Sequence, residues 1–216
     1  MIDFLTSYAG YIAEGIAVTL QITLMSYTLG FALGALLLAG GLSPLSLLTR
    51  MYIEPVRGTP LLVQIFIIYF GLPAIGIKLD AFTSAVLALG LNSAAYQAEI
   101  LRSAVKAIPE SQIHAAEVLG FSGAQTYRYV ILPLALRSSI PALVNEFVTV
   151  LKESSLASVI GIVELTRRGE YVAAYTYRAF EAYLIVALIY FIACYTFSQF
   201  SRLLERKLRI PGYTGA

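Results

Sequence analysis

The sequence has little charge. Asp, Glu, Lys and Arg make up 13% of its 216 residues, about half the share that is typical of a soluble domain. Apolar residues make up 58%, and the mean hydropathy is +0.77. This composition excludes a cytosolic enzyme, and it excludes a disordered chain because disorder requires low hydrophobicity and high charge. It predicts an integral membrane protein.

Cysteine, histidine and tryptophan are nearly absent. Cys194 is the only cysteine, which excludes an intramolecular disulfide, and His114 is the only histidine, which leaves no cluster with metal-ligand spacing. The sequence also lacks a Gly-x-x-x-x-Gly-Lys-Ser/Thr phosphate loop and a Gly-x-Ser-x-Gly nucleophile elbow. We therefore expect no catalytic residues, no metal site and no nucleic-acid partner, and we expect a protein that is not itself an enzyme.

Four charge-free stretches are long enough, or nearly so, for membrane-spanning helices of roughly 20 residues. They are 15–49, 58–77, 81–98 and 182–201. A fifth apolar stretch, 127–151, is interrupted by Pro133, Arg137, Pro141 and Glu146. Because an intramembrane charge is tolerated only where it faces protein or water, we expect this stretch to lie inside an assembly.

The sequence thus predicts an all-α, polytopic membrane protein in which residues 1–216 form one transmembrane domain. Its five spans are placed at roughly 14–41, 58–77, 81–101, 127–151 and 181–202. The N-terminal stretch has neither a basic n-region nor a cleavage site, so we expect the first span to be retained.

Lys and Arg are distributed unequally between the two predicted sides. If the spans alternate, ten lie on the side of the segments 41–57 and 102–137 and the C-terminal tail, and five lie on the other side. Since short loops rich in Lys and Arg stay in the cytoplasm, we expect the N-terminus outside and the C-terminus inside. The segment 102–128 is then the longest cytoplasmic loop.

The middle of that loop predicts a short helix at 111–120. Pro109 suits a helix start, the Ala115-Ala116-Glu117 core favours helix, and Gly120 suits its end. Two small alanines on an exposed helix would let the groove of another protein approach the backbone. The simpler alternative is an ordinary connector between two spans.

At this loop the sequence resembles a known family. The Ala115-Ala116 pair, Gly120 and the run Val130-Ile131-Leu132-Pro133 are similar in type and spacing to the coupling-loop motif of bacterial ABC-importer permeases. His114 stands where that motif usually has Glu, and Val130 stands where Ile is usual. The segments 54–64, 92–102, 152–156 and 159–166 resemble those of the polar amino-acid subgroup, so the resemblance covers about residues 15–207.

The resemblance implies the type I ABC-importer permease fold in the prokaryotic cytoplasmic (inner) membrane, in contact with its lipid. In such importers an extracytoplasmic binding protein delivers the amino acid, two permease subunits form the path, and two ABC ATPase subunits drive alternating access. ATP and Mg²⁺ would bind to the ATPase partners, so this chain would hold no cofactor. We expect the second permease to be an identical copy, which makes the permease a homodimer.

The resemblance also assigns residues that couple the chain to its ATPase. They are His114, Ala115, Ala116, Glu117 and Gly120. As the only histidine, His114 either makes coupling sensitive to pH or simply provides a polar contact to the ATPase.

Two rows of polar residues follow helical spacing in the third and fourth spans. Asn92, Tyr96, Glu99 and Ser103 form the first row, and Asn145, Thr149, Lys152 and Glu153 form the second. Polar groups at bilayer depth are costly and usually functional. We therefore expect five residues to bind substrate: Asn92, Glu99, Asn145, Thr149 and Glu153.

The two carboxylates would suit a basic amino acid such as arginine, histidine or lysine. Alternatives remain open for both: Glu99 can pair with Arg102 three residues on, and Glu153 can be neutralised by Lys152 at the outer membrane boundary. The main alternative function is a permease for neutral polar amino acids such as glutamine. A remote alternative is a non-ABC channel or a membrane assembly protein.

Overall fold

The computed structural model describes residues 2–41 and 46–208, and every regular element in these two stretches is a helix. The all-α fold predicted from the sequence is confirmed. The elements are α1 (Ile2–Gly41), α2 (Ser46–Gly58), α3 (Leu61–Phe66), the π-helix η1 (Ile67–Gly71), the 3₁₀-helix η2 (Leu72–Ile75), α4 (Ala81–Lys106), α5 (Glu110–Val118), α6 (Gly123–Thr126), the π-helix η3 (Tyr127–Ile131), α7 (Leu132–Glu153), the 3₁₀-helix η4 (Ser154–Ile160), α8 (Leu165–Thr176) and α9 (Ala179–Leu208).

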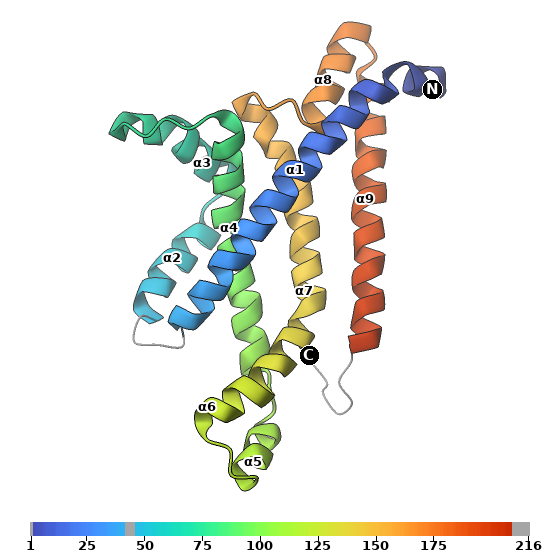
Figure 1. Cartoon of the computed structure of the whole chain (residues 1–216). Coiled ribbons are helices and arrows are strands. Elements are labelled where there is room, and N and C mark those ends of the chain that lie inside the picture. The colour runs from blue at the N-terminus through green and yellow to red at the C-terminus, as the bar shows by residue number, and fades with distance from the viewer. Residues whose placement is uncertain (1, 42–45, 209–216) are drawn as a thin grey trace.

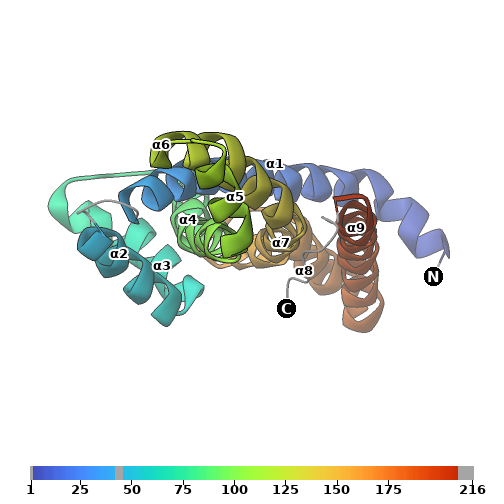
Figure 2. The ribbon, with the colours of Figure 1, turned by 90° about the horizontal axis from the view of Figure 1, so that it is seen from below.

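The long helices run between two ends of an elongated molecule (Figure 1). α1 crosses α4 and α7 diagonally, α2 and α3 lie at one side, and α9 lies at the other. α5 and α6 project from the lower end of the view, and α8 lies at the upper end. Figure 2, seen from below, shows α4 and α7 between these outer helices. α4 and α7 are therefore the central pair of the chain.

Three helical stretches of the described residues are long and apolar enough to cross a membrane: 7–39, 123–160 and 179–207. A fourth crossing arises if α2 and the run from α3 to η2 count as one span, although the two halves meet at 109°. The third predicted span, 81–101, is not among these four stretches and lies in α4. This helix buries polar residues such as Asn92, Ser93 and Gln97, and a helix enclosed by protein does not need the hydropathy of a lipid-facing one.

Two described helices were not anticipated from the sequence. The segment 41–57, expected as a loop, contains α2, whose buried Ile53 packs against Ala95 and Ala98 of α4. Pro60 stands at the N-cap of α3 with an extended backbone, which accounts for the break between α2 and α3. The other unanticipated helix is α8, which follows directly on Glu164.

Glycines bring α1 close to α4. A Cβ atom at Gly30 would lie 2.9 Å from the side chain of Gln97, and one at Gly34 would lie 3.1 Å from the carbonyl oxygen of Ala94. Small residues allow membrane helices to approach in this way. The van der Waals contacts formed by this close approach stabilise the helix pair in lipid, where burial of apolar surface contributes little.

Candidate functional site

A group of polar side chains joins α4 to α7 near the middle of α4. The hydroxyl of Ser93 donates to Oε1 of Glu146 at 2.7 Å, and Nε2 of Gln97 donates to the Ser93 hydroxyl at 3.0 Å and to the backbone carbonyl of Tyr27 at 3.2 Å. Glu146 is 8% exposed and Gln97 is fully buried. The sequence identified Glu146 only as an interruption of the fourth span, because its partner Ser93 lies 53 positions away.

A second group of polar side chains links the bend between α2 and α3 to α4. Nδ2 of Asn92 donates to Oε1 of Gln64 at 3.1 Å. Nε2 of Gln64 in turn donates to the carbonyl of Val56 at 2.7 Å and to the hydroxyl of Thr59 at 3.0 Å. Asn92, predicted to bind substrate, is 5% exposed and holds this bend. Gln64 was not among the predicted site residues.

Glu99 lies among arginines. Nε of Arg102 donates to its Oε1 at 2.8 Å, and Nη2 of Arg102 also contacts its Oε2. Nη1 of Arg57 lies 3.7 Å from the same carboxylate, and the Arg57 guanidinium lies 5.1 Å from the centre of the Tyr96 ring. These contacts favour the ion-pair alternative for Glu99, with Arg57 as a second partner that sequence spacing could not suggest.

α7 carries the remaining predicted substrate residues. Asn145 and Lys152 are exposed, and Thr149 and Glu153 are half-buried. The Thr149 hydroxyl donates to the carbonyl of Asn145 at 3.2 Å, within its own helix. Asn145 lies near the middle of the membrane-spanning stretch 123–160, where an exposed polar side chain has to face protein or water rather than lipid. This side of α7 is thus a surface that the chain does not cover by itself.

The two predicted acidic residues lie on opposite sides of the Ser93–Glu146 hydrogen bond. α4 and α7 run in opposite directions (Figure 1), so Glu99 lies about 9 Å below that level and Glu153 about 10 Å above it, at 1.5 Å of rise per residue. A separation of about 20 Å along the helices is too long for one amino acid to contact both carboxylates.

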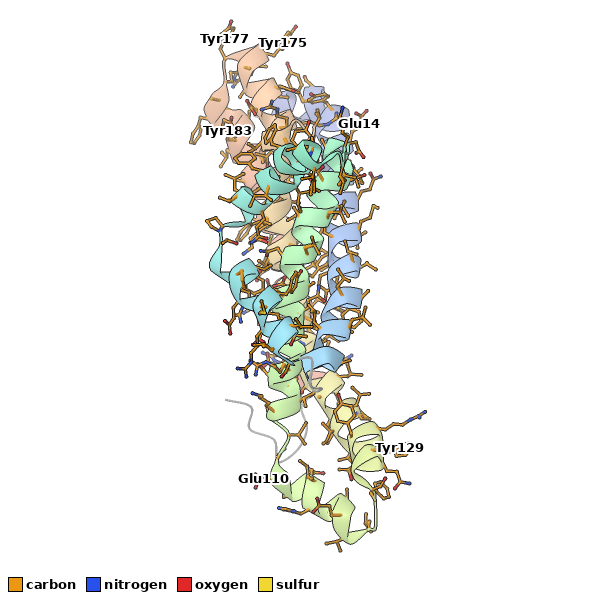
Figure 3. The ribbon with its side chains drawn as sticks, turned by 90° about the vertical axis from the view of Figure 1, so that its left-hand side faces the viewer. Glu14, Glu110, Tyr129, Tyr175, Tyr177 and Tyr183 are labelled. Atoms are coloured by element: carbon orange, nitrogen blue, oxygen red, sulfur yellow. The ribbon has the colours of Figure 1, made fainter. Side chains whose placement is uncertain are left out.

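The loop between α4 and α7 folds into a short helical hairpin at the lower end, where Figure 3 shows Glu110 and Tyr129. α5 begins after Pro109 at its N-cap, and Gly120 adopts a left-handed backbone (φ +82°) just after its end. His114, Ala115 and Glu117 are exposed, and Nδ1 of His114 lies 3.2 Å from Oε2 of Glu117.

Of the two alanines in this motif, only Ala115 is available to another protein, since Ala116 is 3% exposed. The exposed apolar surface continues instead onto two residues at the end of the helix. Val118 is 89% exposed and Leu119 is 75% exposed. Sequence reasoning did not single out these two residues, although they lie between Glu117 and Gly120 of the motif.

At the opposite end, α8 is anchored by Glu164, which is fully buried. Its carboxylate accepts hydrogen bonds from the backbone N–H groups of Thr166 and Arg167, both at 2.9 Å, and from the hydroxyl of Tyr190 at 3.0 Å. Burial raises the pKa of this carboxyl above its ordinary value, and the donated hydrogen bonds act in the opposite direction.

Comparison with known proteins agrees with the sequence motifs. Residues 26–210 match the family of binding-protein-dependent transport system inner membrane components. The arginine transport system permease protein ArtQ of Bacillus subtilis is 39% identical, over 92% of this chain and 93% of that protein. The glutamine transport system permease protein GlnP of Escherichia coli is 41% identical, over 91% of this chain and 92% of that protein.

Solved structures show the same arrangement of helices. The crystal structure of an amino acid ABC transporter with histidines superimposes with a TM-score of 0.90 at 43% identity, over 94% of this chain and 96% of that chain. An inward-facing MetNI methionine ABC transporter has a TM-score of 0.76 at 21% identity. The resemblance to amino-acid ABC permeases is therefore confirmed, and the chain belongs to the family of binding-protein-dependent transport system inner membrane components.

Proposed function

We propose that this chain forms the translocation path of an ATP-driven importer of polar amino acids together with a second, identical copy. The observation that carries this proposal is the uncovered polar side of α7, with Asn145 and Lys152 exposed. Lipid does not accommodate such a surface, whereas a partner subunit or a water-filled path does. The lipid-facing helices of the two copies would contact the surrounding membrane.

The path would recognise its substrate through Asn145, Thr149 and Glu153 of α7. Asn92 would contribute to the same recognition from α4. Glu153 is the carboxylate that would meet the cationic group of a basic amino acid such as arginine, histidine or lysine. Glu99 is less suited to this role, because Arg102 and Arg57 already neutralise it. Neutral polar substrates such as glutamine remain the second candidate, and the relatives named above include permeases for both arginine and glutamine.

Coupling would take place at the α5–α6 hairpin. We propose that His114, Ala115, Glu117 and Gly120 lie in a groove of the ATPase partner, with Ala116 supporting the helix from within. ATP and Mg²⁺ would be bound by two such ATPase subunits, and an extracytoplasmic binding protein would deliver the amino acid. The hairpin end would then be cytoplasmic, with the N-terminus outside and the C-terminus inside.

The test is ATP-dependent uptake of labelled arginine into vesicles that contain the chain, its ATPase and its binding protein, with unlabelled glutamine as competitor. We expect saturable arginine uptake that glutamine inhibits weakly. A Glu153→Gln variant should lower arginine uptake about tenfold or more, because a hydrogen bond to a charged group contributes about 1.5–3 kcal/mol. The matched control is Glu170→Gln, which changes an exposed glutamate on α8.

Each other outcome changes one part of the proposal. Full competition by glutamine would assign the chain to neutral polar substrates. A Glu99→Gln variant that lowers arginine uptake as much as Glu153→Gln would return Glu99 to the site. ATP hydrolysis without uptake of either amino acid would refute the substrate class. A His114→Glu variant that changes ATPase stimulation equally at mildly acidic and neutral pH would exclude a pH switch at the coupling helix.

A further inference from the structure

A cavity of about 520 Å³ lies between the C-terminal part of α1, α2 and the lower half of α4. Four basic side chains line it, together with two acidic ones: Arg50, Arg57, Arg102, Lys106, Glu54 and Glu99. Its lining therefore has a formal charge of +2. Glu99 already pairs with Arg57 and Arg102, whereas Arg50 and Lys106 form no ion pair with the described residues. The cavity is thus suited to an anion.

An apolar groove of about 370 Å³ adjoins this cavity, and the two share Leu37 and Thr49 in their walls. Leu36 and Leu48 line the groove and are 68% and 60% exposed. Tyr52 forms another part of the wall, where its hydroxyl donates to the carbonyl of Leu91 at 2.6 Å. The basic cavity therefore continues into the apolar groove along the outside of α1.

We propose that the cavity and the groove together bind one anionic phospholipid. Its phosphate would lie among Arg50, Arg57 and Lys106, since guanidinium and ammonium groups bind phosphate oxygens through charge-assisted hydrogen bonds. One acyl chain would cover Leu36 and Leu48 in the groove. Basic pockets between membrane helices are suited to lipid headgroups in this way.

Two features favour an anionic lipid over other occupants. A zwitterionic lipid brings its own cation, which the +2 charge of the lining would repel. A free phosphate ion would use only the cavity and would leave the adjoining leucines without a partner. This inference goes beyond the proposed function and requires only that the chain spans a membrane.

The absence of tryptophan provides the test. A Leu48→Trp substitution places the only indole of the chain beside the groove, and brominated lipids quench its fluorescence on contact. The full-length chain is reconstituted in phosphatidylcholine vesicles that contain either brominated phosphatidylglycerol or brominated phosphatidylcholine. We expect brominated phosphatidylglycerol to quench about fivefold more effectively per molecule, because each nearby basic residue attracts anionic lipid.

The charge requirement is tested in the same background. In the double variant Arg50→Gln with Lys106→Gln, the ratio of quenching by brominated phosphatidylglycerol to quenching by brominated phosphatidylcholine should fall to about one. The matched control, Arg206→Gln with Lys207→Gln, removes two exposed charges from α9 at the same end and should leave the preference unchanged.

Three results would overturn the proposal. Equal quenching by the two lipids would remove the preference for an anion. An equal loss of this preference in the test and control variants would mean that general surface charge, rather than the cavity, attracts the anionic lipid. Equal quenching by the two lipids, combined with a fluorescence change on addition of inorganic phosphate that Arg50→Gln with Lys106→Gln removes, would make the cavity a small-anion site. None of these measurements uses the ATPase or an amino acid, so they fail or succeed independently of the proposed function.

Discussion

Glu164 offers the most direct test of how the upper end of the fold is held together. In Glu164→Ala, α8 loses its N-cap acceptor, and the hydroxyls of Tyr190 and Thr19 lose the carboxylate that accepts from them at 3.0 and 3.4 Å. Because Glu164 is fully buried, water cannot easily replace these bonds. α8 would thereby lose one buried link to α9 and one to α1, while Arg168 would still pair with Glu14 of α1 and Thr166 would still donate to Tyr190 of α9.

The expected loss of stability follows from these contacts. Removing an N-cap acceptor costs about 1 kcal/mol, and each of the two hydroxyls left without its acceptor, on the buried Thr19 and the half-buried Tyr190, costs about 1 kcal/mol more. A total of about 3 kcal/mol corresponds to a decrease in Tm of about 6–12 °C for a chain of this size.

Thermal unfolding of the purified chain in detergent measures this decrease. Tyr190→Phe and the double variant complete a double-mutant cycle, in which we expect a coupling energy of about 1 kcal/mol. Glu170→Ala is the control, since Glu170 is an exposed residue of the same helix that pairs with Arg167, and exposed pairs contribute little. A loss for Glu164→Ala no larger than that of the control would refute the reasoning.

The raised pKa of Glu164 gives the same experiment a pH dependence with a defined sign. Burial is the larger cause, so the folded-state pKa lies above the ordinary value of 4.5. Such a group stabilises the fold most below its unfolded-state pKa, and this contribution is lost as the pH rises through the folded-state pKa. The advantage of the wild type over Glu164→Gln, which does not titrate, should decrease upward from about pH 4.5. An advantage that grows with pH would mean that the hydrogen-bond donors outweigh burial.

Two further predictions concern helix packing and coupling. Gly34→Leu should destabilise the chain by about 1–3 kcal/mol, because even a Cβ atom at this position would lie 3.1 Å from the Ala94 carbonyl oxygen. The control in the same thermal measurement is Gly10→Leu, because nothing lies within 4 Å of a Cβ atom there. Equal effects of the two variants would argue against close packing of α1 on α4. Ala115→Arg should lower co-purification with the ATPase about tenfold without changing the Tm of the chain, since Ala115 is exposed. Ala174→Arg, at an exposed alanine of α8 at the opposite end of the molecule, is its matched control, and a co-purification of Ala115→Arg as high as that of this control would remove α5 from the interface.

Much of the fold could be predicted because it depends on local signals. Charge-free stretches indicate where membrane helices lie, and Gly120 indicates the end of α5 because it can adopt a left-handed backbone. α2 and α8 could not be predicted in this way. Neither is long enough to give a span signal, and each is held by distant contacts, Ile53 against α4 and Glu164 with Tyr190.

The candidate site shows the same limit more sharply. Helical spacing correctly suggested that Arg102 could reach Glu99, but no local pattern links Glu99 to Arg57 or Ser93 to Glu146. Those contacts form between helices that are far apart in the sequence. Spacing places polar residues on a shared face of one helix, whereas their partners, and hence the charge left available for a substrate, depend on how the helices pack.

The route from the α5–α6 hairpin to the candidate site follows from chain connectivity. α5 is joined directly to the end of α4, and through α6 and η3 to the start of α7. These are the two central helices that carry the candidate substrate residues, and the Ser93–Glu146 hydrogen bond links them at 2.7 Å. η3 is a π-helical turn, a form that often occurs at functional sites within helices. A displacement of α5 by a partner would therefore act first on the α4–α7 pair, without needing a relay through α1, α8 or α9.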